Sequence, residues 1–193
     1  AFAGEMAVIV DAGMREMLVE QRDVFYYITL MNENYAQPDL PQEAHADVLR
    51  GCYRFGSYGP QDASSKVTLM GSGAILTEVV KAAQALAEEG IASDVFSVTS
   101  WSELARDGQA CDAAGEASFV AKQLAGGSGP VIAATDYVRS VPESIRAFVP
   151  QGRRYVTLGT DGFGRSDTRA ALRRFFGVDA GSVAQAARRA LAG

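Results

Sequence analysis

The residues with the clearest chemical potential lie in a glycine-rich turn, "DGFGRSD" at 161–167, between an apolar run at 155–158 and a helix-like pattern. Many proteins hold a phosphate in such a strand–turn–helix arrangement, because backbone N–H groups at the helix N-terminus point toward the anion. The turn lacks the Lys-Ser/Thr pair of a nucleotide phosphate loop. We expect Ser166 or Asp167 to cap the following helix, and Arg165 has the chemistry to pair with a carboxylate or a phosphate.

A second glycine turn, "MGSG" at 70–73, also lies between an apolar run and a helical pattern. It does not match the GxGxxG fingerprint of dinucleotide-binding folds. No acidic residue ends a strand about 20 residues later, since Asp94 stands at the start of its strand. We therefore expect Gly71 and Gly73 to allow close approach of strand and helix, and Ser72 to cap the helix.

Residues for acid–base catalysis or metal binding are scarce. His45 is the only histidine, and Glu43 and Asp47 at i−2 and i+2 would face away from it on a helix. We interpret it as a surface histidine, which leaves Ser–His or Cys–His catalysis without a base. Cys52 and Cys111 form no CxxC pair, and we expect both to be reduced, buried thiols. The sequence predicts no catalytic residue and no metal ligand.

The Asp-Gly pair at 161–162 is also compatible with part of one further cofactor motif. The thiamine-diphosphate motif begins with Gly-Asp-Gly and needs an asparagine downstream, and its Asp and Asn hold magnesium on the diphosphate. The asparagines of this chain, Asn32 and Asn34, both lie upstream of Asp161. The motif is absent, and we predict no bound cofactor in this chain.

Composition limits the class of protein and its partners. The chain has 193 residues, 48% hydrophobic and 21% charged, which is typical of a soluble globular protein of one domain or one plus a fragment. A net charge of −5 and the absence of a basic run argue against nucleic-acid binding. No apolar stretch approaches the roughly 20 residues of a membrane span, and no signal peptide is visible, so we expect a cytoplasmic protein. The missing initiating Met indicates a piece of a longer chain.

The N-terminal region differs in pattern from the rest. Residues 4–19 carry apolar side chains at helical spacing and are predicted to form an amphipathic helix. The run "DVFYYITLMNENY" at 23–35 predicts a buried strand. Two prolines in residues 36–42 predict a linker, and we place a domain boundary after residue 41.

Beyond the linker, apolar runs alternate with helical patterns. Strands that alternate with helices predict a three-layer α/β/α fold around a mostly parallel sheet. Gly90 and Gly108 are expected to end the first two helices. The predicted strands are 66–73, 93–100, 129–135 and 153–159, and the predicted helices are 74–90, 101–108, 144–149, 167–176 and 181–192.

Ligands of such open sheets bind at the carboxyl ends of the strands, where this chain has polar turns. These turns are Gly71–Gly73, Thr99–Ser100, Thr135–Asp136 and Thr160–Asp161. Ser72, Asp136 and Arg165 are therefore the candidate residues for anion binding or docking.

Several of these stretches together resemble one family. The chain is similar, over about residues 1–180, to the C-terminal end of the homodimeric, bacterial-type pyruvate dehydrogenase E1 component, a transketolase-like thiamine-diphosphate enzyme. The turn "TDGFGRSD" and the pattern "VTSxxELARDG" are specific to this family. The matching stretches are "DVFYYITLMNENYAQPDLP", "TLMGSGAIL", "SDVFSVTSWSELARDG", "AATDYV" and "YVTLGTDGFGRSDTRAALRRFFGVD".

The resemblance implies a domain organisation and a role. Residues 1–41 would be the last helix and strand of the pyrimidine-binding middle domain, and residues 42–193 the transketolase-like C-terminal domain. The parent enzyme would decarboxylate pyruvate on thiamine diphosphate and Mg²⁺ and then acetylate lipoyl groups of its E2 partner. Its catalytic and magnesium-binding residues would lie outside this chain, with Asn32, Glu33 and Asn34 facing the cofactor cleft.

Two functions follow. In the first, the chain is a structural domain that stabilises the E1 dimer and shapes the active-site cleft, and the isolated fragment is inactive. In the second, it is a regulatory module that binds a nucleotide or metabolite anion at Ser72, Thr99, Asp136 and Arg165.

Overall fold

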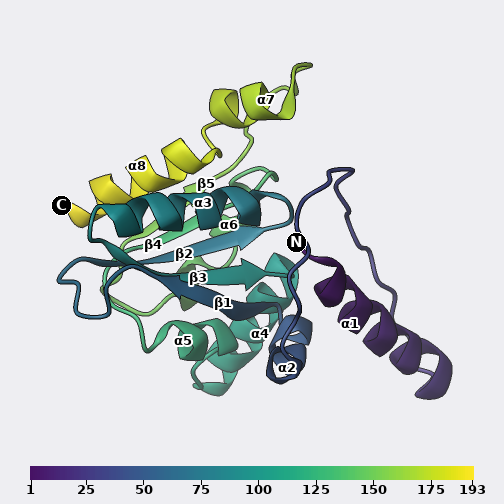
Figure 1. The fold of residues 1–193 in the computed structure, drawn as a ribbon. Helices are drawn as coiled ribbons and strands as arrows, with labels where there is room; N and C mark the ends of the chain where they lie inside the picture. Colours follow the sequence, from purple (N-terminus) through teal and green to yellow (C-terminus); the bar gives the residue numbers. More distant parts are fainter.

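A computed structural model describes residues 1–193, and its centre is a five-stranded sheet in the order β1-β3-β2-β4-β5 (Figure 1). Strands β2 to β5 are parallel, and β1 pairs antiparallel with β3 at one edge. The sheet confirms the predicted α/β class with a mostly parallel sheet. The strands are β1 (Cys52–Tyr58), β2 (Lys66–Ser72), β3 (Ala92–Val98), β4 (Val131–Ala134) and β5 (Tyr155–Leu158).

Helices cover both faces of the sheet (Figure 1). On one face lie α3 (Ile75–Glu88) and α8 (Ala180–Leu191), and on the other lie α4 (Trp101–Ala114) and α5 (Phe119–Leu124). None of the helices combines the length and apolar content that a bilayer crossing requires. The shorter elements are α2 (His45–Leu49), α6 (Ser140–Glu143), α7 (Arg169–Phe176) and 3₁₀ turns at Gln42–Ala44 and Arg146–Phe148.

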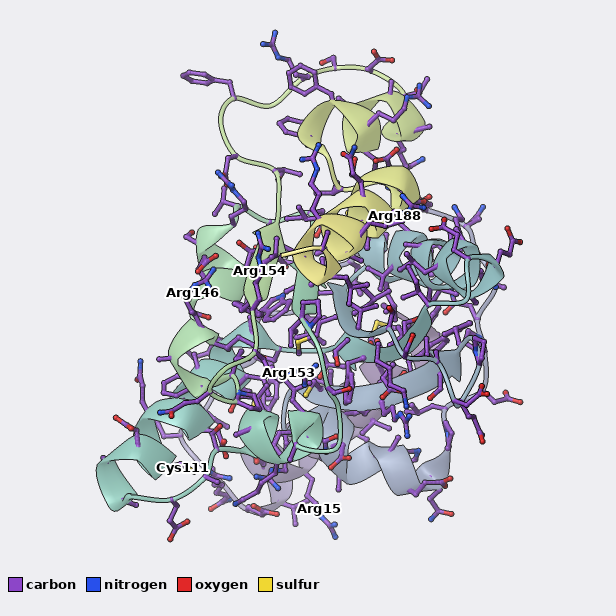
Figure 2. All side chains as sticks on the ribbon, turned by 90° about the vertical axis from the view of Figure 1, so that its left-hand side faces the viewer. Arg15, Cys111, Arg146, Arg153, Arg154 and Arg188 are labelled. Atoms are coloured by element: carbon purple, nitrogen blue, oxygen red, sulfur yellow. The ribbon has the colours of Figure 1, made fainter.

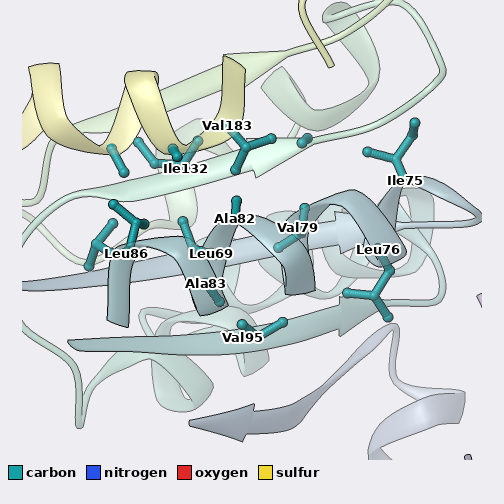
Figure 3. Close-up of a cluster of buried hydrophobic side chains, with 14 of the residues drawn as sticks. Leu69, Ile75, Leu76, Val79, Ala82, Ala83, Leu86, Val95, Ile132 and Val183 are labelled. Carbon is teal, nitrogen blue, oxygen red and sulfur yellow. The ribbon is translucent and has the colours of Figure 1, made fainter. Parts of the chain in front are cut away.

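The two helical layers explain why the strands read as continuous apolar runs. Leu69 of β2 lies in the cluster beneath α3 and α8 (Figure 3), whereas its neighbour Met70 lies in the cluster beneath α4 and α5. Consecutive strand residues point to opposite faces, so a strand covered on both sides needs apolar residues at every position. Val79, Leu86 and Val183 supply the helical side of the first cluster.

The turn after β2 confirms one prediction and contradicts another. A Cβ on Gly71 would lie 2.9 Å from Leu76 Cα, so the glycine does allow close approach of strand and helix. Ser72 does not cap α3, because its hydroxyl pairs with Thr135 Oγ1 at 2.8 Å across to the end of β4. Gly90 follows the last turn of α3 with φ +77°, as expected for a C-terminal glycine.

The prediction that Gly108 ends a helix is wrong. Helix α4 continues to Ala114 and ends at Gly115, which has φ +71°. Gly108 is needed for packing, since a Cβ there would lie 2.2 Å from Cδ2 of Phe148. A glycine in the sequence can therefore mark a close contact on a helix face as well as a helix end.

The N-terminal segment touches the sheet at the start of α1, and the rest of that helix extends away from the sheet (Figure 1). Helix α1 (Ala3–Met14) continues as a π-helical turn at Arg15–Val19, which agrees with the predicted helix. The predicted strand at 23–35 is wrong: residues 21–41 have no regular structure. No strand of this chain lies beside 23–35, and a strand needs a neighbour for its backbone hydrogen bonds. The boundary after residue 41 stays a prediction.

The packing of Gly108 against Phe148 makes a testable prediction. Gly108→Ala should lower the free energy of unfolding by about 1–2 kcal/mol, because overpacking outweighs the gain in helix propensity. Chemical denaturation monitored by circular dichroism measures the change. Gly181→Ala in α8 is the matched control, since its Cβ would meet nothing closer than 3.7 Å, and it should be neutral or stabilising. Equal effects of the two substitutions would contradict the packing role.

Candidate functional site

The carboxyl ends of the parallel strands bring several of the predicted polar residues together. The Ser72–Thr135 hydroxyl pair lies at the ends of β2 and β4. Thr160, just beyond β5, donates a hydrogen bond to the carbonyl oxygen of Asp136 at 2.5 Å. Residues 72, 135–136 and 160 thus form a continuous polar edge, as the parallel topology requires.

Thr99 and Ser100, at the end of β3, do not join this edge. Thr99 donates to the carbonyl oxygen of Val48 at 2.6 Å, and Ser100 caps α4 by accepting from the N–H of Glu103 at 3.2 Å. Both side chains therefore serve local structure.

A pocket of about 270 Å³ opens next to the polar edge, between the turn after β5 and helix α7. One wall is apolar, and the remainder carries one acid, one hydroxyl group and three arginines. Its lining residues are Met31, Ile75, Asp136, Thr160, Gly162, Gly164, Arg165, Arg169, Leu172, Arg173, Phe176 and Val178.

Arg173 on α7 is held by two carboxylates. Its guanidinium pairs with both oxygens of Glu33, at 3.2 and 2.5 Å, and with Oε1 of Glu78 at 3.3 Å. The other oxygen of Glu78 accepts the N–H of Ala180 at 3.1 Å, at the start of α8. All three charged side chains are at least four-fifths buried, so Arg173 joins the N-terminal segment to the helical layer.

Asp136 has no such partner. Apart from its own backbone N–H, no group donates a hydrogen bond to its carboxylate, which lines the pocket in a half-buried position. Burial therefore raises the pKa of Asp136 above its ordinary value, and the positive charge of Arg173 offsets only part of this effect.

Arg165 is exposed and forms no ion pair, and its guanidinium lies over the ring of Phe175 at 5.2 Å. The acid of the same turn, Asp161, is engaged elsewhere: its oxygens accept the backbone N–H of Arg139 at 2.8 Å and its Nε at 2.5 Å. These hydrogen bonds from Arg139 hold the pKa of Asp161 below its ordinary value. Asp161 thus fastens the glycine turn to α6 and leaves Arg165 free on the pocket rim.

The predicted caps of α7 are wrong. Neither Ser166 nor Asp167 caps the helix; Thr168 does, accepting from the N–H of Ala171 at 3.3 Å. The helix begins at Arg169, two residues later than the sequence pattern indicated. Both Arg169 and Arg173 therefore lie within the helix, and their spacing of four residues puts them on the face that lines the pocket.

The predicted cleft residues Asn32, Glu33 and Asn34 lie beside α7. The carbonyl oxygen of Asn32 accepts a hydrogen bond from Arg169, and Glu33 is the bidentate partner of Arg173. Asn34 is exposed. Two members of this predicted set therefore contact the rim of the pocket, and no contact defines a role for Asn34.

The remaining candidates for catalysis lie elsewhere. His45 is exposed at the start of α2. Cys52 and Cys111 are free thiols, and burial raises the pKa of Cys52 to about 12, so it stays protonated. Cys111 is only partly buried. No group of three or more His, Cys, Asp or Glu side chains is arranged to hold a metal ion.

Arg153, labelled in Figure 2, precedes β5 and lies at the amino end of that strand, away from the polar edge. Arg153 donates to the carbonyl oxygens of Gly129 and Leu124 at 2.7 and 2.9 Å and to Thr68 Oγ1 at 2.7 Å. Its donors are therefore used within the fold. The pocket near Arg165, by contrast, is lined by an arginine without an ion pair and by the unpartnered Asp136.

Sequence reasoning found the polar turn at Thr160 but missed the two α7 arginines of the pocket. It also missed Glu5, a buried acid that accepts hydrogen bonds from Tyr53 at 2.9 Å and Ser97 at 2.6 Å. The i, i+4 spacing of Arg169 and Arg173 directly after the glycine turn is a signal that could have found the arginines. No local pattern shows that Glu5 is buried against the sheet, because its partners there, Tyr53 and Ser97, are more than 40 residues away.

Comparison with known proteins gives two family matches. Residues 51–179 match the transketolase-like TK C-terminal domain, and residues 1–38 match the pyruvate dehydrogenase E1 component middle domain.

Similar curated proteins are pyruvate dehydrogenase E1 components. The Cupriavidus necator protein is 47% identical over 99% of this chain, and the Escherichia coli K12 protein is 43% identical over 97%. The chain spans 22% of the length of each.

Similar solved structures include transketolases. That of Leishmania mexicana has a TM-score of 0.53 at 21% identity and covers 77% of this chain and 19% of its own. That of Campylobacter jejuni has a TM-score of 0.52 at 18% identity and covers 72% of this chain and 18% of its own. These likenesses show a shared fold.

The unpartnered carboxylate predicts a stability change. Asp136→Asn should raise Tm at pH 7 by about 1–3 °C, because it removes a desolvated charge. The gain in Tm should shrink as the pH falls from the raised pKa of Asp136 in the folded state toward the ordinary value of 3.8. Below that value the gain should vanish, because Asp136 is protonated in both the folded and the unfolded state. Thermal melts between pH 3 and 8 measure it, with Asp62→Asn, an exposed acid without an ion pair, as the control. An unchanged or lowered Tm at pH 7 would contradict the assignment.

Proposed function

The chain belongs to the transketolase-like C-terminal domain family, in the form carried by the pyruvate dehydrogenase E1 component, and we propose that it stabilises and shapes that enzyme without contributing a catalytic residue. The parent enzyme is proposed to decarboxylate pyruvate and to acetylate the lipoyl groups of E2. Residues 1–41 are assigned to the end of the middle domain and 42–193 to the C-terminal domain.

The observation that carries this proposal is the exposed apolar surface of the N-terminal segment. Large apolar side chains of residues 14–31 stand at least 38% exposed, an arrangement that marks a surface covered by other protein. The middle-domain match covers this segment, so the remainder of that domain is the proposed cover. The exposed side chains are Met14, Met17, Leu18, Val19, Phe25, Tyr26, Tyr27, Ile28, Leu30 and Met31.

Two anchors hold this segment against the α/β domain. Glu5 on α1 is 2% exposed and bonds to Tyr53 on β1 and Ser97 on β3. Glu33, at the other end of the segment, pairs with Arg173 on α7. Polar contacts of this kind fix orientation, so we propose that the C-terminal domain sets the position of residues 32–34 at the cleft.

The acid of the glycine turn supports a cofactor site elsewhere in the parent enzyme. Asp161 accepts hydrogen bonds from Arg139 with both of its carboxylate oxygens. Thiamine diphosphate and Mg²⁺ are therefore proposed for the parent enzyme alone, on residues outside this chain.

The partners and location of the parent enzyme are also proposals. We propose a second E1 subunit and the E2 acetyltransferase as partners, with no nucleic acid and no membrane, in the bacterial cytoplasm. The net charge of −5 supports the exclusion of nucleic acid. An independent regulatory module that binds a nucleotide is not favoured, because the relatives are E1 components over nearly the whole chain.

The isolated 193-residue chain should neither bind thiamine diphosphate nor decarboxylate pyruvate. Titration calorimetry with thiamine diphosphate and Mg²⁺ should give no heat of binding, because the chain supplies no ligand set. The full-length enzyme is the positive control. Micromolar, magnesium-dependent binding to the isolated chain would overturn the proposal.

Within the full-length enzyme, Asn32→Ala should lower kcat for pyruvate more than Arg165→Gln does. Asn32 is proposed to face the cofactor cleft, whereas Arg165 lies on the outer rim of the pocket. Steady-state kinetics of both variants make the comparison. Equal, negligible effects would refute a cleft-facing role for Asn32.

A further inference from the structure

The pocket beside α7 holds arginines whose hydrogen-bond donors the fold uses only in part. Arg173 is fully engaged by Glu33 and Glu78, whereas Arg165 has no carboxylate partner. Arg169 donates one hydrogen bond to the carbonyl oxygen of Asn32 and has one weak ion pair, with its Nε 3.8 Å from Glu33, and its side chain is half exposed. Two guanidinium groups on the rim therefore retain donors for a ligand.

The floor of the pocket is acidic, whereas its rim carries arginines. Asp136 presents a carboxylate without a donor from another residue, and this acid points to a ligand that brings hydrogen-bond donors. An arginine rim and a carboxylate floor within one pocket match a molecule with an anionic end and a donor end.

The apolar wall limits the size and nature of what lies between these ends. Ile75, Leu172, Phe176 and Val178 line one side of a volume of about 270 Å³. This volume lies just below the roughly 300–1,000 Å³ range of drug-sized ligand sites, so it suits a short carbon skeleton.

We propose that this pocket binds a small phosphorylated polyol, with its phosphoryl group on Arg165 and Arg169 and its hydroxyl groups on Asp136. Arginine suits the phosphoryl group because its planar fork offers two parallel N–H donors. Asp136 accepts from hydroxyl groups and disfavours a second phosphoryl group at the floor. The site goes beyond the structural role proposed above, because binding here requires no part of the E1 reaction.

The test is calorimetric titration of the full natural chain with glycerol 3-phosphate, inorganic phosphate and glycerol as separate probes. Glycerol 3-phosphate should bind with a Kd of about 0.1–1 mM, and at least about tenfold more tightly than either of the other two probes. Arg165→Gln should weaken its binding about tenfold. Arg174→Gln is the matched control, since Arg174 is exposed on the adjacent helix α7, lies outside the pocket and forms no ion pair.

Asp136→Asn separates the two ends of the site. Inorganic phosphate should bind to this variant as tightly as to the unchanged protein or more tightly, because a negative charge is removed. The ratio of the affinity for glycerol 3-phosphate to that for inorganic phosphate should fall. Three results would overturn the proposal: no binding of glycerol 3-phosphate up to about 10 mM, equal losses in Arg165→Gln and Arg174→Gln, or an unchanged preference in Asp136→Asn. The first result would leave the structural role of the chain intact, which the thiamine-diphosphate titration tests separately.

Discussion

Arg173 is the cation on which the arrangement of the pocket depends. It satisfies Glu78, which in turn accepts the first N–H of α8, and it satisfies Glu33 on the N-terminal segment. The three side chains are largely removed from water, so the absence of any one would leave a costly uncompensated charge. Helix α7, helix α8 and residues 31–35 therefore hold their relative positions as a unit.

The carboxyl ends of the strands form the side of the pocket that faces α7. Because β2, β4 and β5 run parallel, the turns that follow them meet at one edge, and Gly71 lets α3 begin close to that edge. Ser72 and Thr135 then tie the ends of β2 and β4 together. The position of Asp136 in the pocket and the charged rim are thus consequences of strand direction and of where α7 starts.

The sequence predicted the parts of the fold that local patterns determine. Apolar runs and helical spacing located four of the five strands and both helices of the α3–α8 layer. The missed strand, β1, is an edge strand with Arg54 and Gly56 in it, so its pattern is irregular. The strand predicted at 23–35 failed for a different reason, since its apolar residues have no neighbouring strand in this chain.

The site was predictable only in part. Asp136 and Arg165 were found because strand ends and glycine turns are visible in a sequence. Arg173 and Glu78 were not found, because their roles depend on contacts that span 95 or more residues. Gly108 shows the same limit, since the phenylalanine that excludes a side chain there lies 40 positions away.

The buried acid on α1 has a consequence for the order of events during synthesis. Glu5 leaves the ribosome before Tyr53 and well before Ser97, and the hydroxyl groups that satisfy it meet only after β1 pairs with β3. Helix α1 therefore docks onto the α/β domain late, once this antiparallel edge of the sheet is complete.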